Sequence, residues 1–255
     1  MSKKQVKLFP PLRGVYVDLS KVPDPVFAEK MVGDGFAIDP LENVLYSPID
    51  GKIKSIHRAK HAITLESESG FDILIHIGLE TVSLGGKGFD VKVKEGQLVK
   101  VGDKLTEFDM DYIAGNVVAL ITPVLVTDME EKQISIDILP HGVVTDLNQA
   151  IMLVTLGGEK AAQLADTSVA PVVASLESEL ITIPNTHGIH ARPAAQLNAI
   201  ARKYPNNEIL MLKGEQSANV KSVVSLLSLS VQYQDQIKIL VKGDNATAII
   251  DEIKN

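Results

Sequence analysis

The sequence contains no cysteine and no tryptophan, and only 4% of its 255 residues are aromatic. Without cysteine the chain forms no disulfide, has no thiolate nucleophile and lacks the usual ligands of structural zinc sites. So few aromatic rings argue against a surface that stacks on nucleic-acid bases or sugars. Positive charge is also in short supply, because 25 lysines and arginines face 32 aspartates and glutamates. Nucleic acid is therefore not an expected partner.

Long apolar runs are missing as well. The longest, VVALITPVLV at 117–126, is interrupted by Thr122 and Pro123 and is about half the ~20 residues that a membrane helix needs. The first residues, MSKKQVKLFPPL, carry lysines but no apolar segment, so they do not form a signal peptide. We therefore expect a cytoplasmic protein that does not insert directly into the membrane.

Short β patterns dominate residues 1–157. The segments with this pattern are SPIDGKIKSI, HAITLES, FDILIHIG, KVKEGQLVKVGDKLTEFD and VVALITPVLVT. Asp-Gly, Ser-Gly, Glu-Gly and Gly-Asp turns stand between or within them. Their spacing predicts an all-β sandwich or barrel domain over 1–157. Helical signal is weak there, and DPVFAEKMV at 24–32 predicts one or two turns of helix.

The composition changes after residue 157. Residues 158–176 are small and polar, which is typical of a linker. From 177 to 255 strand and helix patterns alternate as βαββαβα, which predicts a small α+β domain. Its first helix places four residues on one face at spacings of three and four: Leu197, Ile200, Ala201 and Tyr204.

One motif in the C-terminal part suggests chemistry, NTHGIHARPAA at 185–195. His190 occupies the expected N-cap of a helix whose first turn is Ala191, Arg192 and Pro193. First-turn amides and the helix dipole attract a phosphate, and Arg192 adds a cation. A neutral imidazole is a competent nucleophile near pH 7. The pattern fits a histidine that accepts and passes on a phosphoryl group, but it equally fits a capping histidine. His187 is expected to be an exposed, non-catalytic loop residue.

A second pair of histidines lies in the β-rich part. In FDILIHIGLET the apolar face is formed by Phe71, Ile73, Ile75, Ile77 and Leu79. His76 points to the opposite face, and His61 begins the neighbouring strand pattern. Pairing of the two strands across the Ser-Gly turn would bring the imidazoles together. The residues leave three interpretations open: unrelated histidines, a metal site completed by Asp72 or Glu80, or a phosphoryl-transfer pair. No HxH or HExxH spacing supports the metal site.

THGIHARPAAQL and VKSVVSLL resemble HPr, the histidine phosphocarrier of the bacterial sugar phosphotransferase system, over 177–255. The resemblance implies a βαββαβα open-faced sandwich. It also implies that His190 is phosphorylated and that Arg192 stabilises the phosphate, with Ala191 and Pro193 completing the phosphate site. Ser222 stands where some members carry a regulatory phosphoserine. The more favoured interpretation of Ser222 is an N-cap hydroxyl.

The N-terminal part is similar to the glucose-type enzyme IIA of the same system over 20–157. The motifs that carry this resemblance are PDPVFAEKMVGDGFAIDP, SPIDGKI, KHAITLES, LIHIGLETV and EGQLVKVGDKL. It implies a β-sandwich of the duplicated hybrid type, a phosphorylated His76 and a supporting His61. The residues assigned to partner docking are the apolar Phe27, Met31 and Val32 and the acidic Asp24 and Glu80. Glu80 replaces a common Asp and Pro25 is an addition, so partner specificity is where this chain departs from the family.

Together the resemblances imply a phosphocarrier that passes phosphate from enzyme I through His190 and His76 to an enzyme IIB/IIC sugar permease. The cysteine that accepts phosphate in enzyme IIB must lie in another part of the system, because this chain has none. The alternative is a regulatory module that binds transporters or kinases according to its phosphorylation state. No cofactor is expected, except zinc held between His61, His76 and a partner's carboxylate.

A linker of about 20 residues would hold the two domains at a millimolar effective concentration. We therefore predict that phosphate passes from His190 to His76 within one chain. The first-order rate of this transfer, followed after rapid mixing of the phosphorylated protein at a series of dilutions, should not change with protein concentration. A rate that rises in proportion to concentration would contradict the prediction.

Overall fold

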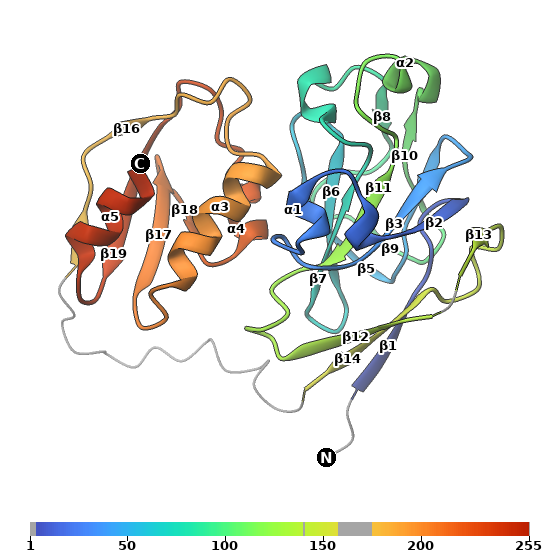
Figure 1. Cartoon of the computed structure of the whole chain (residues 1–255), viewed down its shortest axis with the longest axis horizontal. Coiled ribbons are helices and arrows are strands. Elements are labelled where there is room, and N and C mark those ends of the chain that lie inside the picture. The colour runs from blue at the N-terminus through green and yellow to red at the C-terminus, as the bar shows by residue number, and fades with distance from the viewer. Residues whose placement is uncertain (1–3, 140, 158–174, 255) are drawn as a thin grey trace. The chain divides into compact units, whose positions relative to one another are not determined.

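Antiparallel strand pairing builds both parts of the chain. The computed structural model describes residues 4–139, 141–157 and 175–254 and divides into two units, Met1–Leu164 and Ala165–Asn255 (Figure 1). Of the linker predicted at 158–176, residues 158–174 lie outside the described residues. Ser175 already belongs to the first strand of the C-terminal unit.

Strands are the main regular structure of the N-terminal unit (Figure 1). They are β1 (Lys4–Leu8), β2 (Gly14–Asp18), β3 (Asp34–Pro40), β4 (Val44–Tyr46), β5 (Gly51–Ile56), β6 (Ala62–Ser67), β7 (Asp72–His76), β8 (Phe89–Val91), β9 (Leu98–Val99), β10 (Lys104–Phe108), β11 (Thr122–Val126), β12 (Ile134–Ile138), β13 (Val143–Val144) and β14 (Met152–Leu156). Short helical turns stand between them: η1 (Leu19–Lys21), α1 (Pro25–Ala28), η2 (Thr81–Leu84) and α2 (Met110–Ala114). The predicted all-β fold is confirmed, including the single helical turn within 24–32.

Three sheets arise from these strands. The largest has the order β13-β2-β3-β11-β7-β6-β5-β9, and two smaller sheets have the orders β1-β14-β12 and β4-β10-β8. The apolar alternation along β7 explains its central position, because Phe71, Ile73, Ile75 and Ile77 all enter the main hydrophobic core. The opposite face of β7 is buried too, so the strand is covered on both sides.

The pairing of β6 with β7 sets the position of both histidines of this unit. The register places Ala62 opposite His76, and the backbone N–H of Ile77 donates to the carbonyl of His61 over 2.7 Å. Immediately afterwards the chain turns at Gly78, which has a left-handed φ of 69°. His61 and His76 therefore sit at the same end of adjacent strands.

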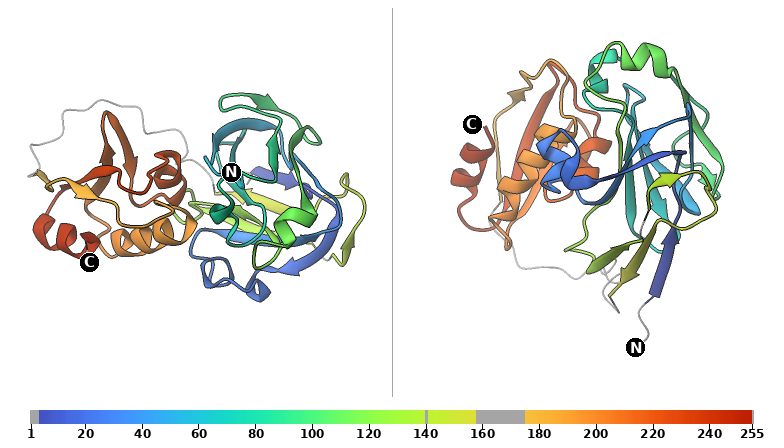
Figure 2. Two further views of the ribbon diagram at one scale, coloured as in Figure 1. Left: turned by 90° about the horizontal axis from the view of Figure 1, so that it is seen from above. Right: turned by 45° about the vertical axis from the view of Figure 1, so that its right-hand side comes forward.

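The C-terminal unit follows the predicted βαββαβα order except that two short strands stand in place of the single first strand. Its elements are β15 (Ser175–Glu177), β16 (Ile181–Thr182), α3 (Ala191–Arg202), β17 (Glu208–Lys213), β18 (Gln216–Asn219), α4 (Val223–Ser228), β19 (Gln236–Lys242) and α5 (Ala246–Lys254). The sheet order is β15-β19-β17-β18, with β16 also paired to β19. Helices α3 and α5 lie side by side on one face of this sheet (Figure 2), which confirms the open-faced sandwich.

Helix α3 buries a narrower stripe than the sequence pattern suggested. The fully buried stripe is formed by Ala194, Ala195 and Ala201 with Asn198, whereas Leu197 and Ile200 are only half-buried. Because α3 contacts both α4 and α5, the small side chains allow a close approach on that side. Within the stretches of chain that the structure describes, no helix combines the length and hydrophobicity needed to span a bilayer.

The end of α3 is tied to α5 by hydrogen bonds to one carboxylate. Lys203 Nζ donates to Glu252 Oε1 over 2.5 Å, and the hydroxyl of Tyr204 donates to Oε2 over 2.6 Å. These two hydrogen bonds, that from Lys203 first, lower the pKa of Glu252. The hydroxyl of Tyr204 therefore anchors the chain just after α3 to α5.

We predict that Gly78→Ala destabilises the N-terminal unit more than Gly70→Ala, its matched control. Both glycines have a left-handed φ, 69° and 82°, so each alanine costs about 1–2 kcal/mol in backbone conformation. A Cβ at Gly70 meets nothing within 4 Å, whereas one at Gly78 lies 2.7 Å from Thr81 Cγ2 and 3.1 Å from the carbonyl oxygen of Ala119. The crowding should cost about 1–3 kcal/mol more. Urea unfolding checks this, and equal losses for the two variants would contradict it.

Candidate functional site

His76 ends strand β7 with its ring orientation defined by one hydrogen bond. Its Nδ1 lies 2.8 Å from the carbonyl oxygen of Gly78. Because a carbonyl oxygen only accepts hydrogen bonds, Nδ1 must carry a proton, and in the neutral ring Nε2 carries the lone pair. The side chain is largely buried, with 7% of the residue exposed. The nucleophilic atom of His76 is therefore Nε2.

His61 lies against His76, as strand pairing across the Ser-Gly turn predicted. The ring centroids are 4.6 Å apart and the planes meet at 69°. His61 is 2% exposed, so its ring is surrounded by protein. Two imidazoles this close, one with its proton on Nδ1, suit a nucleophile with a neighbour that can hydrogen-bond the group it receives.

Of the three apolar residues predicted to dock a partner, two are buried within the unit. Phe27 is 2% exposed and packs edge-on against His76 with ring centroids 5.2 Å apart. Val32 is 4% exposed, and Met31 is half-buried. Phe27 thus supports the His76 ring from within the unit, and of the three only Met31 presents substantial surface.

The two predicted acidic docking residues lie in loops that flank the site. Asp24 is the N-cap of α1, and its Oδ1 accepts a hydrogen bond from the backbone N–H of Val26 over 3.0 Å. Glu80 is exposed and adopts a left-handed φ of 61° two residues after Gly78. Its carbonyl oxygen accepts a 2.8 Å hydrogen bond from the hydroxyl of Ser83. Local geometry therefore fixes the carboxylate of Asp24 and the backbone of Glu80.

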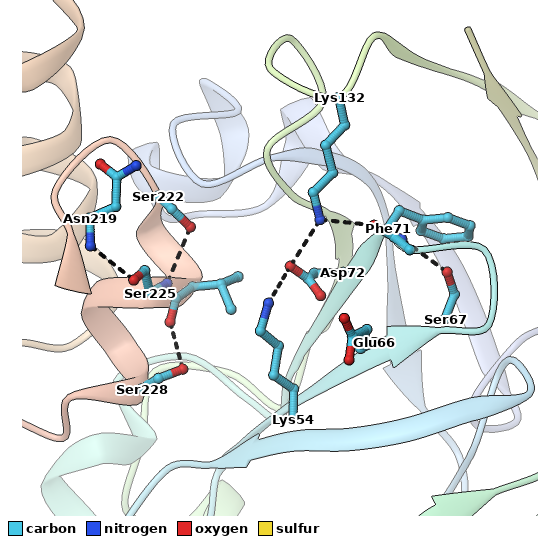
Figure 3. A network of polar contacts seen from close by, with 12 residues as sticks. Lys54, Glu66, Ser67, Phe71, Asp72, Lys132, Asn219, Ser222, Ser225 and Ser228 are labelled. Carbon is cyan, nitrogen blue, oxygen red and sulfur yellow. Dashed lines mark hydrogen bonds and ion pairs between the residues drawn. The ribbon is translucent and has the colours of Figure 1, made fainter. Parts of the chain in front are cut away.

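Asp72, the other carboxylate considered as a metal ligand, is engaged in ion pairs. Its Oδ2 accepts from Lys54 Nζ at 2.7 Å and from Lys132 Nζ at 3.3 Å (Figure 3). The side chain is only 2% exposed. In the part of the chain that the structure describes, no group of three or more histidine, cysteine, aspartate or glutamate side chains is arranged to hold a metal.

One residue of this site was missed by sequence reasoning. His57 packs edge-on against His61 with ring centroids 4.5 Å apart. The signal for His57 was present in HRAKH, because a tight hairpin brings its first and last residues together.

His190 in the C-terminal unit is the N-cap of the 12-residue helix α3, as predicted. Its backbone is extended, with φ −105° and ψ −170°, and its carbonyl accepts from the N–H of Ala194 over 3.0 Å. Arg192 is exposed, and Ala191 is buried. Since proline has no N–H, the first-turn amides before Ala194 belong to Ala191 and Arg192, and Pro193 shapes the turn.

The loop before His190 is pinned to the segment after α4. Gly188 has a φ of 66°, and a Cβ there would lie 2.1 Å from the carbonyl oxygen of Val231. The N–H of Ile189 donates to that same oxygen over 2.9 Å. His187 is exposed, and its ring centroid is 6.4 Å from that of His190. These contacts with Val231 hold the loop that leads to His190 at the N-terminus of α3.

Ser222 is the N-cap of α4. Its Oγ accepts from the N–H of Ser225 over 3.2 Å, and Ser225 Oγ accepts from the N–H of Asn219 over 3.0 Å (Figure 3). The capping role expected of Ser222 is confirmed. A regulatory role remains a prediction.

Comparisons with known proteins agree with the division of the chain into two units. Residues 6–132 match the family described as "phosphoenolpyruvate-dependent sugar phosphotransferase system, EIIA 1", and residues 177–255 match "PTS HPr component phosphorylation site". The PTS system glucose-specific EIIA component of Staphylococcus epidermidis is 45% identical over 130 residues, which is 51% of this chain and 78% of that protein. The component of the same name from Staphylococcus aureus is 40% identical over 154 residues, 60% of this chain and 92% of that protein.

A solved structure extends the match to the fold. Glucose permease IIA from Mycoplasma capricolum is 37% identical, with a TM-score of 0.55, and the match covers 59% of this chain and 96% of that one. The sequence motifs, the sheet topology and these relatives all lead to one conclusion. The chain belongs to the EIIA family of the sugar phosphotransferase system and carries an HPr domain after its EIIA domain in the same polypeptide.

Proposed function

We propose that the chain receives a phosphoryl group at His190 and passes it to His76. Membership of the EIIA and HPr families makes it a phosphoryl carrier of the sugar phosphotransferase system, and the proposal concerns the route within the chain. The observation that carries it is the 2.8 Å hydrogen bond between His76 Nδ1 and the Gly78 carbonyl. This bond places a proton on Nδ1, so Nε2 is the nitrogen of His76 that forms a bond to phosphorus.

His190 takes the phosphoryl group from the phosphohistidine of enzyme I, which is charged by phosphoenolpyruvate. A ring nitrogen of His190 forms a bond to phosphorus as the bond between phosphorus and the enzyme I histidine breaks. The negative charge on the phosphoryl oxygens is stabilised by the first-turn amides, the dipole of α3 and the guanidinium of Arg192. Positioning and charge stabilisation supply the catalysis.

In the second transfer Nε2 of His76 attacks phosphorus, and the bond to the His190 nitrogen breaks. His61, with its ring centroid 4.6 Å away, donates a hydrogen bond to the transferred group. The Gly78 carbonyl stabilises the Nδ1 proton as the ring gains positive character. Asp24 and Glu80 attract arginines of the docking partner.

The phosphoryl group then leaves for a cysteine of an enzyme IIB sugar permease. This third acceptor lies outside residues 1–255, which contain no cysteine. Its thiolate displaces the phosphoryl group from Nε2 of His76, and the neutral ring with its Nδ1 proton is restored. The carrier is then ready for another cycle.

The order of the two histidines is tested by charging the protein with phosphoenolpyruvate and purified enzyme I that contains no other HPr. Intact mass should show two acid-labile phosphoryl groups on the unsubstituted chain and one on His76→Ala. His190→Ala should carry none, because both labels enter through His190. His187→Ala, the matched control in the adjacent loop, should carry two.

Two results would contradict the relay. Labelling of His76 in the His190→Ala chain at the rate of the unsubstituted chain would show that His190 is not the entry point. Loss of all label from His76→Ala would reverse the proposed order. Retention of the far-ultraviolet circular dichroism spectrum by each variant shows that the substitution has not unfolded either unit.

A further inference from the structure

Four aromatic rings form a continuous row in the N-terminal unit. Phe27 contacts His76, His76 contacts His61, and His61 contacts His57, with ring centroids 5.2, 4.6 and 4.5 Å apart. All three contacts are edge-on. His61 is 2% exposed and has an imidazole on either side of it. His57 has no role in the relay described above.

The ring of His57 is held by its own hairpin turn. The backbone N–H of Ala59 donates to His57 Nδ1 over 3.1 Å. The N–H of His57 donates to the carbonyl of Ala62 over 2.9 Å, and the N–H of Lys60 donates to the carbonyl of His57 over 2.6 Å. Lys60 completes the turn with a left-handed φ of 58°. The turn that joins β5 to β6 therefore fixes both the backbone and the ring of His57.

This hydrogen bond also determines the tautomer of His57. Because an N–H only donates, Nδ1 of His57 must carry the lone pair, and in the neutral ring the proton sits on Nε2. His76 has the opposite arrangement, with its proton on Nδ1. His61 thus lies between two imidazoles whose protons are assigned to different nitrogens by backbone groups.

We propose that His57 is a positioning residue that holds the ring of His61 at the angle from which it meets the phosphoryl group on His76. The inference rests on the proposed function of His61 and His76. Without the His57 ring, a space the size of an imidazole opens beside His61, and the His61 ring can turn into it. Loss of this alignment slows transfer, because catalysis by positioning is sensitive to displacements of about 1 Å. Docking of the donor is unaffected.

Three substitutions separate the ring contact from the turn. His57→Phe keeps a ring against His61 but cannot accept from Ala59. His57→Asn keeps an acceptor for the Ala59 N–H, as asparagine does in such turns, but has no ring. His57→Ala removes both. His141→Ala is the matched control, because His141 bonds to the Leu139 carbonyl in its own loop and belongs to none of these ring contacts.

Transfer is measured between two forms of the full chain. The donor is His76→Ala phosphorylated at His190, and the acceptor carries His190→Ala together with each substitution. His57→Asn and His57→Ala should lower the maximal rate by about tenfold at an unchanged half-saturating donor concentration. His57→Phe and His141→Ala should retain the full rate. The proposal would be overturned if His57→Asn kept the full maximal rate while His57→Phe lost it. It would also be overturned if the substitutions changed only the half-saturating donor concentration.

A second measurement does not depend on transfer. Long-range ¹H–¹⁵N spectra of the unphosphorylated chain report the tautomer of each histidine, and they should show the proton on Nε2 of His57 and on Nδ1 of His76. The His61 signals should shift in His57→Ala and His57→Asn and stay in place in His57→Phe. Unchanged His61 signals in His57→Ala would overturn the positioning role. An unsubstituted acceptor that takes no phosphate at His76 would overturn the proposed function instead.

Discussion

Strands β6 and β7 pair with Ala62 opposite His76, and the rest of the candidate site depends on this register. Side chains alternate along a strand, so a slip of one residue would turn His76 into the hydrophobic core and Ile75 or Ile77 out of it. The burial of Phe71, Ile73, Ile75 and Ile77 in that core makes such a slip costly. The stability of the core thus fixes the geometry of a polar site on the other face of the same strand.

The two histidines that we assign to the relay are placed by different means. His76 is nearly buried on a sheet, and its neighbours are side chains, so its environment is built from tertiary contacts between β6, β7 and the turn at 57–61. His190 is the N-cap of α3, and the groups that we propose to stabilise its phosphate are the amides and dipole of that one helix and an arginine two residues away. The helix site is local in sequence, and the sheet site is not.

Sequence reasoning was accordingly more complete for one site than for the other. The N-cap position of His190, the first turn of α3 and the exposed loop at His187 follow from neighbouring residues, and the structure has each of them. In the sheet site the closeness of His61 and His76 was predictable from alternation and a Ser-Gly turn. The burial of Phe27 was not, because its contact with His76 joins residues far apart in the sequence. His57 was missed for a different reason, since its role depends on the precise shape of a four-residue turn.

By itself the sequence determined the order of elements, the two-domain division, the family and the two pairs of histidines, because these depend on local periodicity and on short contiguous motifs. Only the tertiary structure decided which nitrogen of His76 carries the lone pair, which ring lies behind His61, and which side chains near the site are covered. Each of these depends on a contact of a few ångströms between groups whose directions are set by strand register and turn conformation. Local patterns indicate the faces of an element, but only packing determines what each face meets.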